Sequence, residues 1–314
     1  MRAWVGVTDW DWYRFLAGQP DIEEVNFWQP GGTRSFTSLA SGELFLFKLK
    51  SPRNVIAGGG FFVHSTLLPL SLAWDTFGVG NGASSRDEMK RMIDSHRRRK
   101  GGSTANYTIG CVLLAQPFFL PEASWIPAPP DWKPNIVQGK GYDLTREPGL
   151  SIFSQITHSL RAPSAEPSWP ALLRDLPEDP RERYGQPVLV RPRLGQGLFR
   201  ALVTDAYDRK CAVTSEKVLP VLEAAHIRPY RLDGPHQVNN GILLRSDLHR
   251  LFDDGYLTVN QELRLEVSHR IHEEFDNGRV YYAFNGQKLR SPSNPDYAPS
   301  LSYLAWHNEE IYLG

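Results

Sequence analysis

The sequence predicts an α+β protein made of two domains. Its 314 residues exceed the usual size of one domain, and a hydrophobic content of 41% is ample for two packed cores. Aromatic and apolar runs of strand length fill the first half of the chain, and a cluster of histidines, asparagine and carboxylate follows in the second half. We therefore expect a mixed β domain at 1–160, a proline-rich linker at 161–194 with one short helix at 171–175, and a second domain at 195–314.

The first domain is expected to alternate strands with short helices. Thr8 and Asp9 are suited to cap a helix that follows the first apolar strand, and Ser84 or Ser85 is suited to cap a later one. Three consecutive glycines at 58–60 inside a strand pattern indicate a bulge or a close backbone approach. The expected elements are strands at 3–7, 24–32, 42–50, 54–63 and 107–114, helices at 10–16, 72–77 and 84–93, and an extended strap at 121–150.

The second domain is expected to contain a hairpin that leads into a helix. Its elements are a helix at 198–207, hairpin strands at 211–214 and 219–226 with a turn at 214–217, a helix at 246–252, strands at 256–259, 264–267 and 280–284, and a closing helix in the tail. His236, in a Gly-Pro-His loop, is expected to face solvent.

The charge balance excludes DNA binding by bulk positive charge. The formal net charge is +0 and the pI is about 7.1, so a nucleic-acid contact needs a local basic face. Cys111 and Cys211 lack the spacing of a cysteine-rich zinc site, and two free thiols in a reducing compartment are expected. The chain has neither an apolar run of about 18 residues nor the pattern of a signal peptide, so we expect a cytoplasmic protein without membrane contact.

One set of residues, His226, Asn240, His249 and Asp253, points to a specific chemistry. His249 and Asp253 are four positions apart, so on a helix their imidazole and carboxylate face the same way and can bind a divalent metal. His226 ends an apolar run and is free to act as a general base. Asn240 precedes Gly241 at an expected turn, where its amide can bridge backbone groups.

These residues resemble the motif of the HNH nuclease family, in which a hairpin and a helix form a ββα-metal site. The stretch AHIRP…NNGILLRSDLHRLFDDG carries the resemblance. It implies that His226 is the general base, that Asn240 ties the loop and orients the base, and that His249 binds the metal. Asp253 then matches the metal ligand one helical turn further on. The implied cofactor is Mg²⁺ or Mn²⁺, and the implied activity is hydrolysis of DNA phosphodiester bonds.

One position departs from the family pattern. Many members place an aspartate or a histidine directly before the general base, as a further metal ligand, and here that position is Ala225. The metal would then be held by two protein side chains, with phosphate oxygens and water completing the shell. Glu223 or Asp247 could substitute for the missing ligand, and the sequence leaves the choice open.

The first domain resembles the EVE/PUA-like barrels at the N terminus of modification-dependent (type IV) restriction nucleases. The pieces WVGVTDWDWYRFL, GELFLFKL and NVIAGGGFF carry this resemblance. It implies a mixed β-barrel-like domain that holds a flipped, modified base, for example a modified cytosine, in an aromatic cage. The candidates are Trp10, Trp28, Phe61, Phe62 and Trp74 for stacking, with Asp9 and Asn26 for the edge of the base.

Basic side chains supply candidate contacts to the DNA backbone. The run at 97–100 has glycines after it, as in a loop that orders on DNA, and two arginines stand where the second domain begins. The candidates are Arg97, Arg98, Arg99, Lys100, Arg191 and Arg193, with Lys48 and Lys50 as further ones.

The two resemblances together predict a restriction enzyme directed to modified double-stranded DNA. One HNH site cuts one strand, so a double-strand break requires a homodimer or two encounters. Alternatives stay open: an HNH nuclease guided by phosphorothioate DNA, a non-catalytic DNA-binding protein with a degenerate HNH fold, and a toxin or homing-type nuclease.

Overall fold

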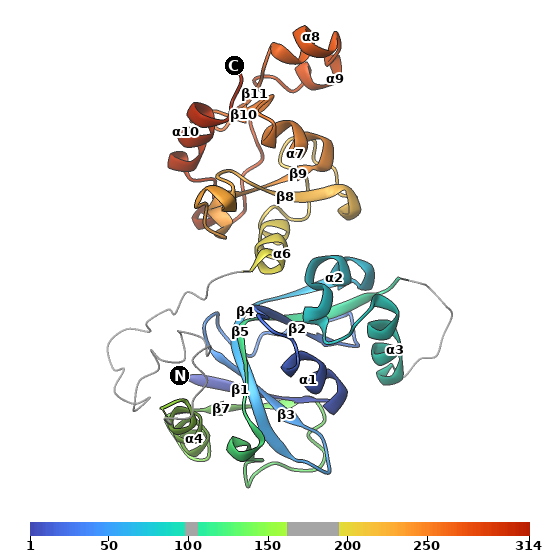
Figure 1. The fold of residues 1–314 in the computed structure, drawn as a ribbon, viewed down its shortest axis with the longest axis vertical. Helices are drawn as coiled ribbons and strands as arrows, with labels where there is room; N and C mark the ends of the chain where they lie inside the picture. Colours follow the sequence, from blue (N-terminus) through green and yellow to red (C-terminus); the bar gives the residue numbers. More distant parts are fainter. Residues whose placement is uncertain (98–105, 162–194) are drawn as a thin grey trace. The chain divides into compact units, whose positions relative to one another are not determined.

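The computed structural model describes residues 1–97, 106–161 and 195–314 (Figure 1). Five of the residues expected to contact the DNA backbone lie outside these ranges: Arg98, Arg99, Lys100, Arg191 and Arg193. The expected helix at 171–175 and all but the first residue of the expected linker also lie outside them. The chain divides into two compact units, Met1–Arg193 and Leu194–Gly314, which we call the N-terminal and C-terminal units. Both combine helices and strands, which confirms the α+β class.

A seven-stranded sheet organises the N-terminal unit, with the order β2-β5-β4-β3-β1-β7 and β6 paired to β4. Strands β1 and β3 run parallel, and every other pair is antiparallel. The strands are β1 (Arg2–Thr8), β2 (Glu24–Gln29), β3 (Leu44–Leu49), β4 (Val55–Pro69), β5 (Thr108–Phe119), β6 (Ile126–Pro127) and β7 (Gly139–Asp143). Part of the expected strap is therefore sheet, because β6 and β7 lie within 121–150.

The helices of this unit are α1 (Trp10–Ala17), α2 (Leu70–Phe77), α3 (Arg86–His96) and α4 (Gly149–Arg161). The Ser85 side chain caps α3 by accepting from the backbone N–H of Glu88 at 3.2 Å, while the Glu88 carboxylate accepts from the Ser84 N–H at 2.8 Å. Helix α4 was not expected from the sequence. None of the described helices is long and apolar enough to cross a membrane.

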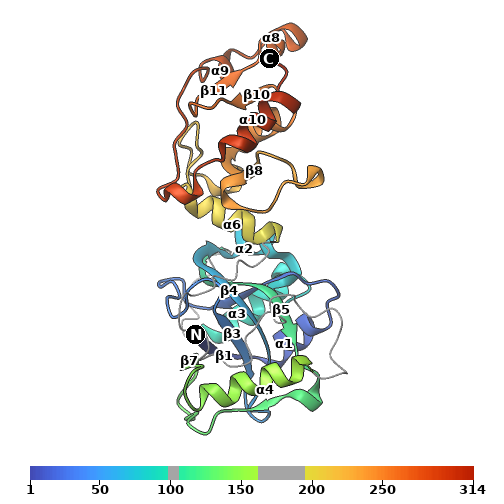
Figure 2. The same ribbon diagram turned by 90° about the vertical axis from the view of Figure 1, so that its left-hand side faces the viewer.

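Both faces of the sheet are covered, which explains why β3 is buried throughout. Leu44 and Leu46 pack in one cluster with Phe153 of α4, whereas Phe45 and Phe47 pack in another with residues of α1. The ribbon views show α1 and α4 on either side of the sheet (Figures 1 and 2). Alternate residues of a strand point to opposite faces, so α1 and α4 cover opposite faces of the sheet.

The expected bulge in β4 is confirmed. The pairing of β4 with β3 shifts at Phe47/Lys48, and its pairing with β5 shifts between Gly59 and Phe61. A Cβ atom at Gly58 would lie 2.3 Å from the carbonyl oxygen of Phe118. The glycines therefore permit a backbone approach that a larger residue would block.

The C-terminal unit is built around two short hairpins and a helix. Strands β8 (Leu222–His226) and β9 (Gly241–Arg245) pair antiparallel, as do β10 (Leu257–Val259) and β11 (Leu265–Val267). Helix α7 (Ser246–Asp253) follows β9 directly. The remaining helices are α6 (Gln196–Ala206), α8 (Arg270–Phe275), α9 (Arg279–Tyr282) and α10 (Leu301–Glu310), which is the expected closing helix.

Two expectations for this unit are wrong. Residues 211–214 form a turn, not the first hairpin strand, because the Ser215 N–H bonds to the Cys211 carbonyl at 3.0 Å and Ser215 has φ 59°. The apolar character of the stretch reflects burial of Cys211, Ala212 and Val213. Residues 279–282 form helix α9, where a strand was expected at 280–284.

Candidate active site

The polar set found in the sequence lies at the end of β8, in the turn directly before β9, and on α7. His226 ends β8 and pairs with Gly241 at the start of β9. Its ring stacks on Phe199 of α6, with centroids 3.8 Å apart and planes at 12°. His249 and Asp253 lie on α7, one helical turn apart, as expected from their spacing. The motif residues are thus positioned by consecutive elements of one chain segment.

Asn240 closes the loop that joins the two strands of the hairpin. Its side-chain oxygen accepts from the Arg228 N–H at 2.9 Å, and its amide donates to the carbonyls of Arg228 and Pro235, each at 2.9 Å. Its side chain is fully buried, and its backbone carbonyl accepts from the N–H of Ile227 at 2.9 Å. Asn240 therefore fixes the path of the backbone directly after His226.

His226 is held in its neutral form. Burial, reinforced by the neighbouring His236 and His249, lowers the pKa of His226 to about 4. At neutral pH the imidazole therefore carries one proton and one lone pair. A general base requires such a lone pair, so the surroundings of His226 suit proton abstraction.

His249 lies between two carboxylates. Its Nδ1 is 2.6 Å from Oε2 of Glu223, and its Nε2 is 3.3 Å from Oδ2 of Asp253. Two donors that share an octahedral ion at about 2.1 Å lie about 3 Å apart, so the His249–Asp253 pair fits a common ion. Within residues 1–97, 106–161 and 195–314, no group of three or more His, Cys, Asp or Glu side chains is arranged to hold a metal.

Glu223 and Asp247, the two residues that could substitute for the ligand missing at Ala225, have different surroundings. Ala225 is fully buried and pairs with Ile242. Glu223 shares the face of Ala225 because the two residues are two apart on β8, and this face carries the contact to His249. Asp247 instead binds the guanidinium of Arg245 with both oxygens, at 2.7 and 2.8 Å. Of the two, Glu223 is therefore the carboxylate beside His249, and it contacts Nδ1, whereas Asp253 lies at Nε2.

His236 is a site residue that the sequence did not reveal. It was expected to face solvent, but its Nδ1 lies 3.0 Å from Nε2 of His226 and its ring stacks on Tyr230 with centroids 4.4 Å apart. The loop that Asn240 closes brings His236 back onto His226, ten positions earlier. No periodicity in the sequence reports such a contact, since it depends on the path of the loop.

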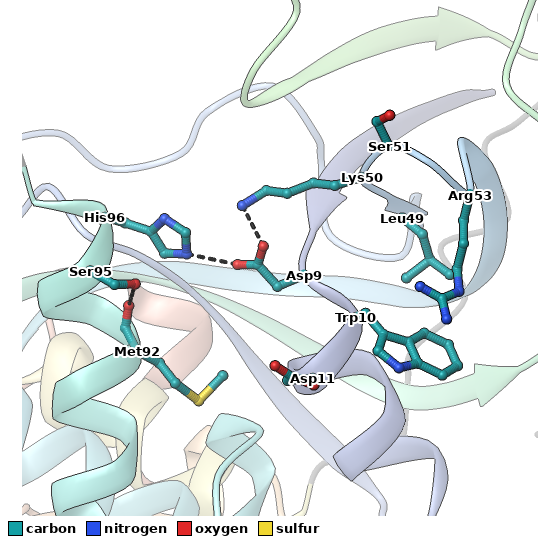
Figure 3. A pocket seen from close by; sticks show the side chains of 10 residues that line it. All are labelled: Asp9, Trp10, Asp11, Leu49, Lys50, Ser51, Arg53, Met92, Ser95 and His96. Carbon is teal, nitrogen blue, oxygen red and sulfur yellow. Dashed lines mark hydrogen bonds and ion pairs between the residues drawn. The ribbon is translucent and has the colours of Figure 1, made fainter.

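In the N-terminal unit, a hollow of about 400 Å³ contains two of the expected base-binding residues, Asp9 and Trp10. The Asp9 carboxylate points toward His96, at 2.7 Å from its Nε2, and pairs with Lys50 (Figure 3). The guanidinium of Arg53 lies over the Trp10 ring, 3.8 Å from its centroid. Asp9 occupies the N-cap position of α1 but makes no side-chain cap bond there, because its carboxylate is engaged by the two basic groups.

Three residues that were expected to bind the base, Phe61, Phe62 and Asn26, lie in the core instead. Phe61 and Asn26 have no exposed surface, and Phe62 is 6% exposed. The Asn26 amide donates to the side-chain oxygen of Asn81 at 2.9 Å. These side chains pack within the sheet and its coverings, so they present no face to a base.

Three other candidates of this unit do not line the hollow, namely Trp28, Trp74 and Arg97. Trp28 donates to the carbonyl of Asn81 at 3.0 Å, although its ring is 6.2 Å from that of His96, and Trp74 is half-buried on α2. Arg97 stacks over Tyr107 at 3.9 Å and donates to the carbonyl of Pro30 at 3.0 Å. Among the residues around the hollow that were not expected there are His96 and Arg53, which come from segments distant in the sequence from Asp9 and Trp10.

Comparison with known proteins identifies one part of the chain. A family model described as an HNH endonuclease matches residues 211–260, which span β8, β9 and α7. No curated protein matches the chain. Among solved structures, a modification dependent TagI restriction endonuclease aligns over 97% of this chain and 81% of its own, with 12% identity and a TM-score of 0.27. At that TM-score the likeness carries no weight for the function of this chain.

Proposed function

From the premise that residues 211–260 are an HNH endonuclease domain, which makes this protein a nuclease, we propose that it is a metal-dependent restriction enzyme for modified double-stranded DNA. The observation that carries the catalytic part is the neutral, half-buried His226 beside the His249–Asp253 pair. These groups meet the two needs of phosphodiester hydrolysis, a base for water and a place for a cation.

In this proposal His226 takes a proton from water, and the resulting oxygen nucleophile attacks phosphorus as the bond to the leaving 3′-oxygen breaks. Asn240 holds the loop that follows His226, and so keeps the imidazole on the strand end that faces α7. Glu223 accepts a hydrogen bond from Nδ1 of His249, which leaves Nε2 of His249 free as a ligand toward Asp253.

HNH nucleases generally use a divalent metal, and His249 with Asp253 would hold it here. A bound Mg²⁺ or Mn²⁺ would stabilise the negative charge that develops on the phosphate and on the leaving oxygen. One imidazole and one carboxylate suit these ions, with phosphate and water oxygens filling the remaining positions.

The N-terminal unit is proposed to read the modification. Support comes from the hollow beside β1 and α1. A base stacked on the Trp10 ring would take the place of the Arg53 guanidinium, and its polar edge would compete with His96 and Lys50 for the Asp9 carboxylate. Lys50 and Arg53 at the same hollow provide positive charge for the phosphate of a flipped nucleotide.

The proposal is tested by cleavage of matched plasmids that are unmodified or carry 5-methyl, 5-hydroxymethyl, glucosylated or phosphorothioate DNA. With Mg²⁺ or Mn²⁺, we expect cleavage of one base-modified plasmid and no cleavage in the presence of a chelator. Equal cutting of all plasmids would refute the reading of modification.

Two other outcomes would replace the proposal by its rivals. Cutting confined to phosphorothioate DNA would identify a sulfur-guided nuclease. Failure to cut any plasmid with either metal, together with retained DNA binding, would identify a non-catalytic DNA-binding protein.

A further inference from the structure

In the C-terminal unit, the imidazole rings of His226 and His236 are held against each other by neighbouring side chains. Nε2 of His226 and Nδ1 of His236 are 3.0 Å apart, and the two ring planes meet at 58°. Phe199 stacks on one ring at 3.8 Å and Tyr230 stacks on the other at 4.4 Å. Two aromatic rings therefore hold two imidazoles so that a nitrogen of one faces a nitrogen of the other.

The loop that carries His236 is anchored independently of this contact. Asn240 donates to the carbonyl of Pro235, the residue directly before His236, at 2.9 Å. The Gly234 N–H bonds to the carbonyl of Pro229 at 3.1 Å, and a Cβ atom at Gly234 would lie 1.8 Å from the carbonyl oxygen of Arg228. Hydrogen bonds to Gly234 and Pro235, together with the close approach of Gly234 to Arg228, therefore fix the backbone directly before His236.

The contact between the two nitrogens requires one proton, because two lone pairs at this distance would repel. A base needs a second nitrogen with an exposed lone pair, and Nε2 of His226 is already occupied by His236. Nδ1 is the nitrogen that remains. It carries a lone pair only if the shared proton lies on Nε2 of His226, which then donates to Nδ1 of His236.

We infer that His236 is a positioning residue: it accepts a hydrogen bond from Nε2–H of His226, and so leaves Nδ1 of His226 as the atom that takes the proton from water. This inference rests on the proposed role of His226 as general base. When Nδ1 gains its proton, the Nε2–H becomes part of an imidazolium and its bond to neutral His236 becomes charge-assisted. The pair therefore stabilises the transition state more than the resting enzyme.

The test compares three substitutions of His236 in the full-length protein. In His236→Asn the amide oxygen can take the place of Nδ1 and accept from His226, because both atoms are one bond from Cγ. In His236→Ala no acceptor remains, and in His236→Gln the amide lies one bond further out. His272→Ala, an exposed histidine on α8 whose side chain is 68% accessible, is the matched control.

We expect His236→Ala to lower kcat about 10- to 100-fold with little change in KM, as for other partners that orient a catalytic or ligating imidazole. His236→Asn should recover most of this loss, His236→Gln less, and His272→Ala should match the wild type. Equal losses in the Ala and Asn variants, or an unchanged kcat in His236→Ala, would overturn the inference.

A second measurement uses the free protein and needs no activity. The ¹⁵N chemical shifts of the His226 ring distinguish a protonated Nε2 from a protonated Nδ1. We expect Nε2–H in the wild type and in His236→Asn, and a mixture of tautomers in His236→Ala. Nδ1–H in the wild type would overturn the assignment. Cleavage of DNA by His226→Ala would show that the proposed base is wrong. The ring shifts of the wild-type protein would still report which nitrogen of His226 carries the proton, so the two failures are distinguishable.

Discussion

The two candidate sites of this protein differ in how the chain assembles them. The site of the C-terminal unit is drawn from one continuous segment, from Glu223 on β8 to Asp253 on α7. The hollow of the N-terminal unit joins three segments that are far apart, at 9–11, 49–53 and 92–96. The first site could be found from spacing within the sequence, whereas the second required the sheet and α3 to be in place.

The comparison also shows two ways to control charge. In the C-terminal unit, burial keeps His226 neutral and lowers its pKa to about 4. In the N-terminal unit, the carboxylate of Asp9 is paired with both His96 and Lys50 at an open hollow. The first arrangement suits proton transfer and the second suits recognition of a polar, charged ligand.

The largest expected effect concerns the base. His226→Ala should lower cleavage about 10²- to 10⁴-fold, the range that general-base catalysis contributes, while DNA binding stays close to that of the wild type. Nicking assays and a gel-shift assay measure the two properties. Substantial cleavage by this variant would show that His226 is not the general base. The contrast between a unit for proton transfer and a unit for recognition would then lose its support.

The next largest effect tests whether the loop between β8 and β9 depends on the side-chain amide of Asn240 for its stability. Asn240→Ala leaves the Arg228 N–H and two carbonyls without their partners, so we expect a loss of about 2–4 kcal/mol in the free energy of unfolding. Chemical denaturation measures it. Asn294→Ala, where the side chain accepts one bond from Asp296 at 3.0 Å, is the control and should cost much less.

A third prediction examines the hollow. Trp10→Ala should weaken binding to modified DNA by about 1–3 kcal/mol, the contribution of one stacked base, and leave binding to unmodified DNA unchanged. Trp74→Ala is the control, since Trp74 lies on α2 and does not line the hollow. Titration of fluorescent duplexes measures both, and equal effects of the two substitutions would argue against the hollow as the base site.

The smallest effect is the pH dependence of stability. Burial lowers the pKa of His307 to about 4, as it does for His226, and both histidines belong to the C-terminal unit. Below pH 6.5 the unfolded chain takes up protons that the folded unit refuses, so stability falls from pH 6.5 down to pH 4. Over the single unit from pH 6.5 to pH 5.5, the loss for the buried His307 is about 1 kcal/mol, which makes this the smallest of the four effects.

Hydrogen exchange measured at pH 6.5 and pH 5.5, and corrected for intrinsic rates, resolves this loss along the chain. We expect reduced protection in α7 and α10, since His307 on α10 bonds to the Phe252 carbonyl of α7 at 3.1 Å. A loss of protection confined to the N-terminal unit would contradict the prediction.

By itself, the sequence determined the α+β class and most elements whose signal is local. Alternating or apolar runs predicted β1, β3 and β5, and the serine cap predicted α3. The four-residue step from His249 to Asp253 predicted that both side chains share one face of α7. It also located His226 and Asn240, because the motif is contiguous. The prediction was wrong at 211–214, where apolar residues are buried in a turn and not in a strand. It was also wrong for Phe61 and Phe62, whose aromatic side chains pack in the core and do not face a ligand.

Only the tertiary structure decided which side chains meet across a loop or a sheet. It brought His236 onto His226, chose Glu223 over Asp247 as the carboxylate beside His249, and joined His96 and Arg53 to Asp9 and Trp10. The physical reason is the same in each case. Local spacing fixes the direction of neighbouring side chains, whereas contacts between distant residues depend on the path of the backbone, which the packing of the whole unit determines.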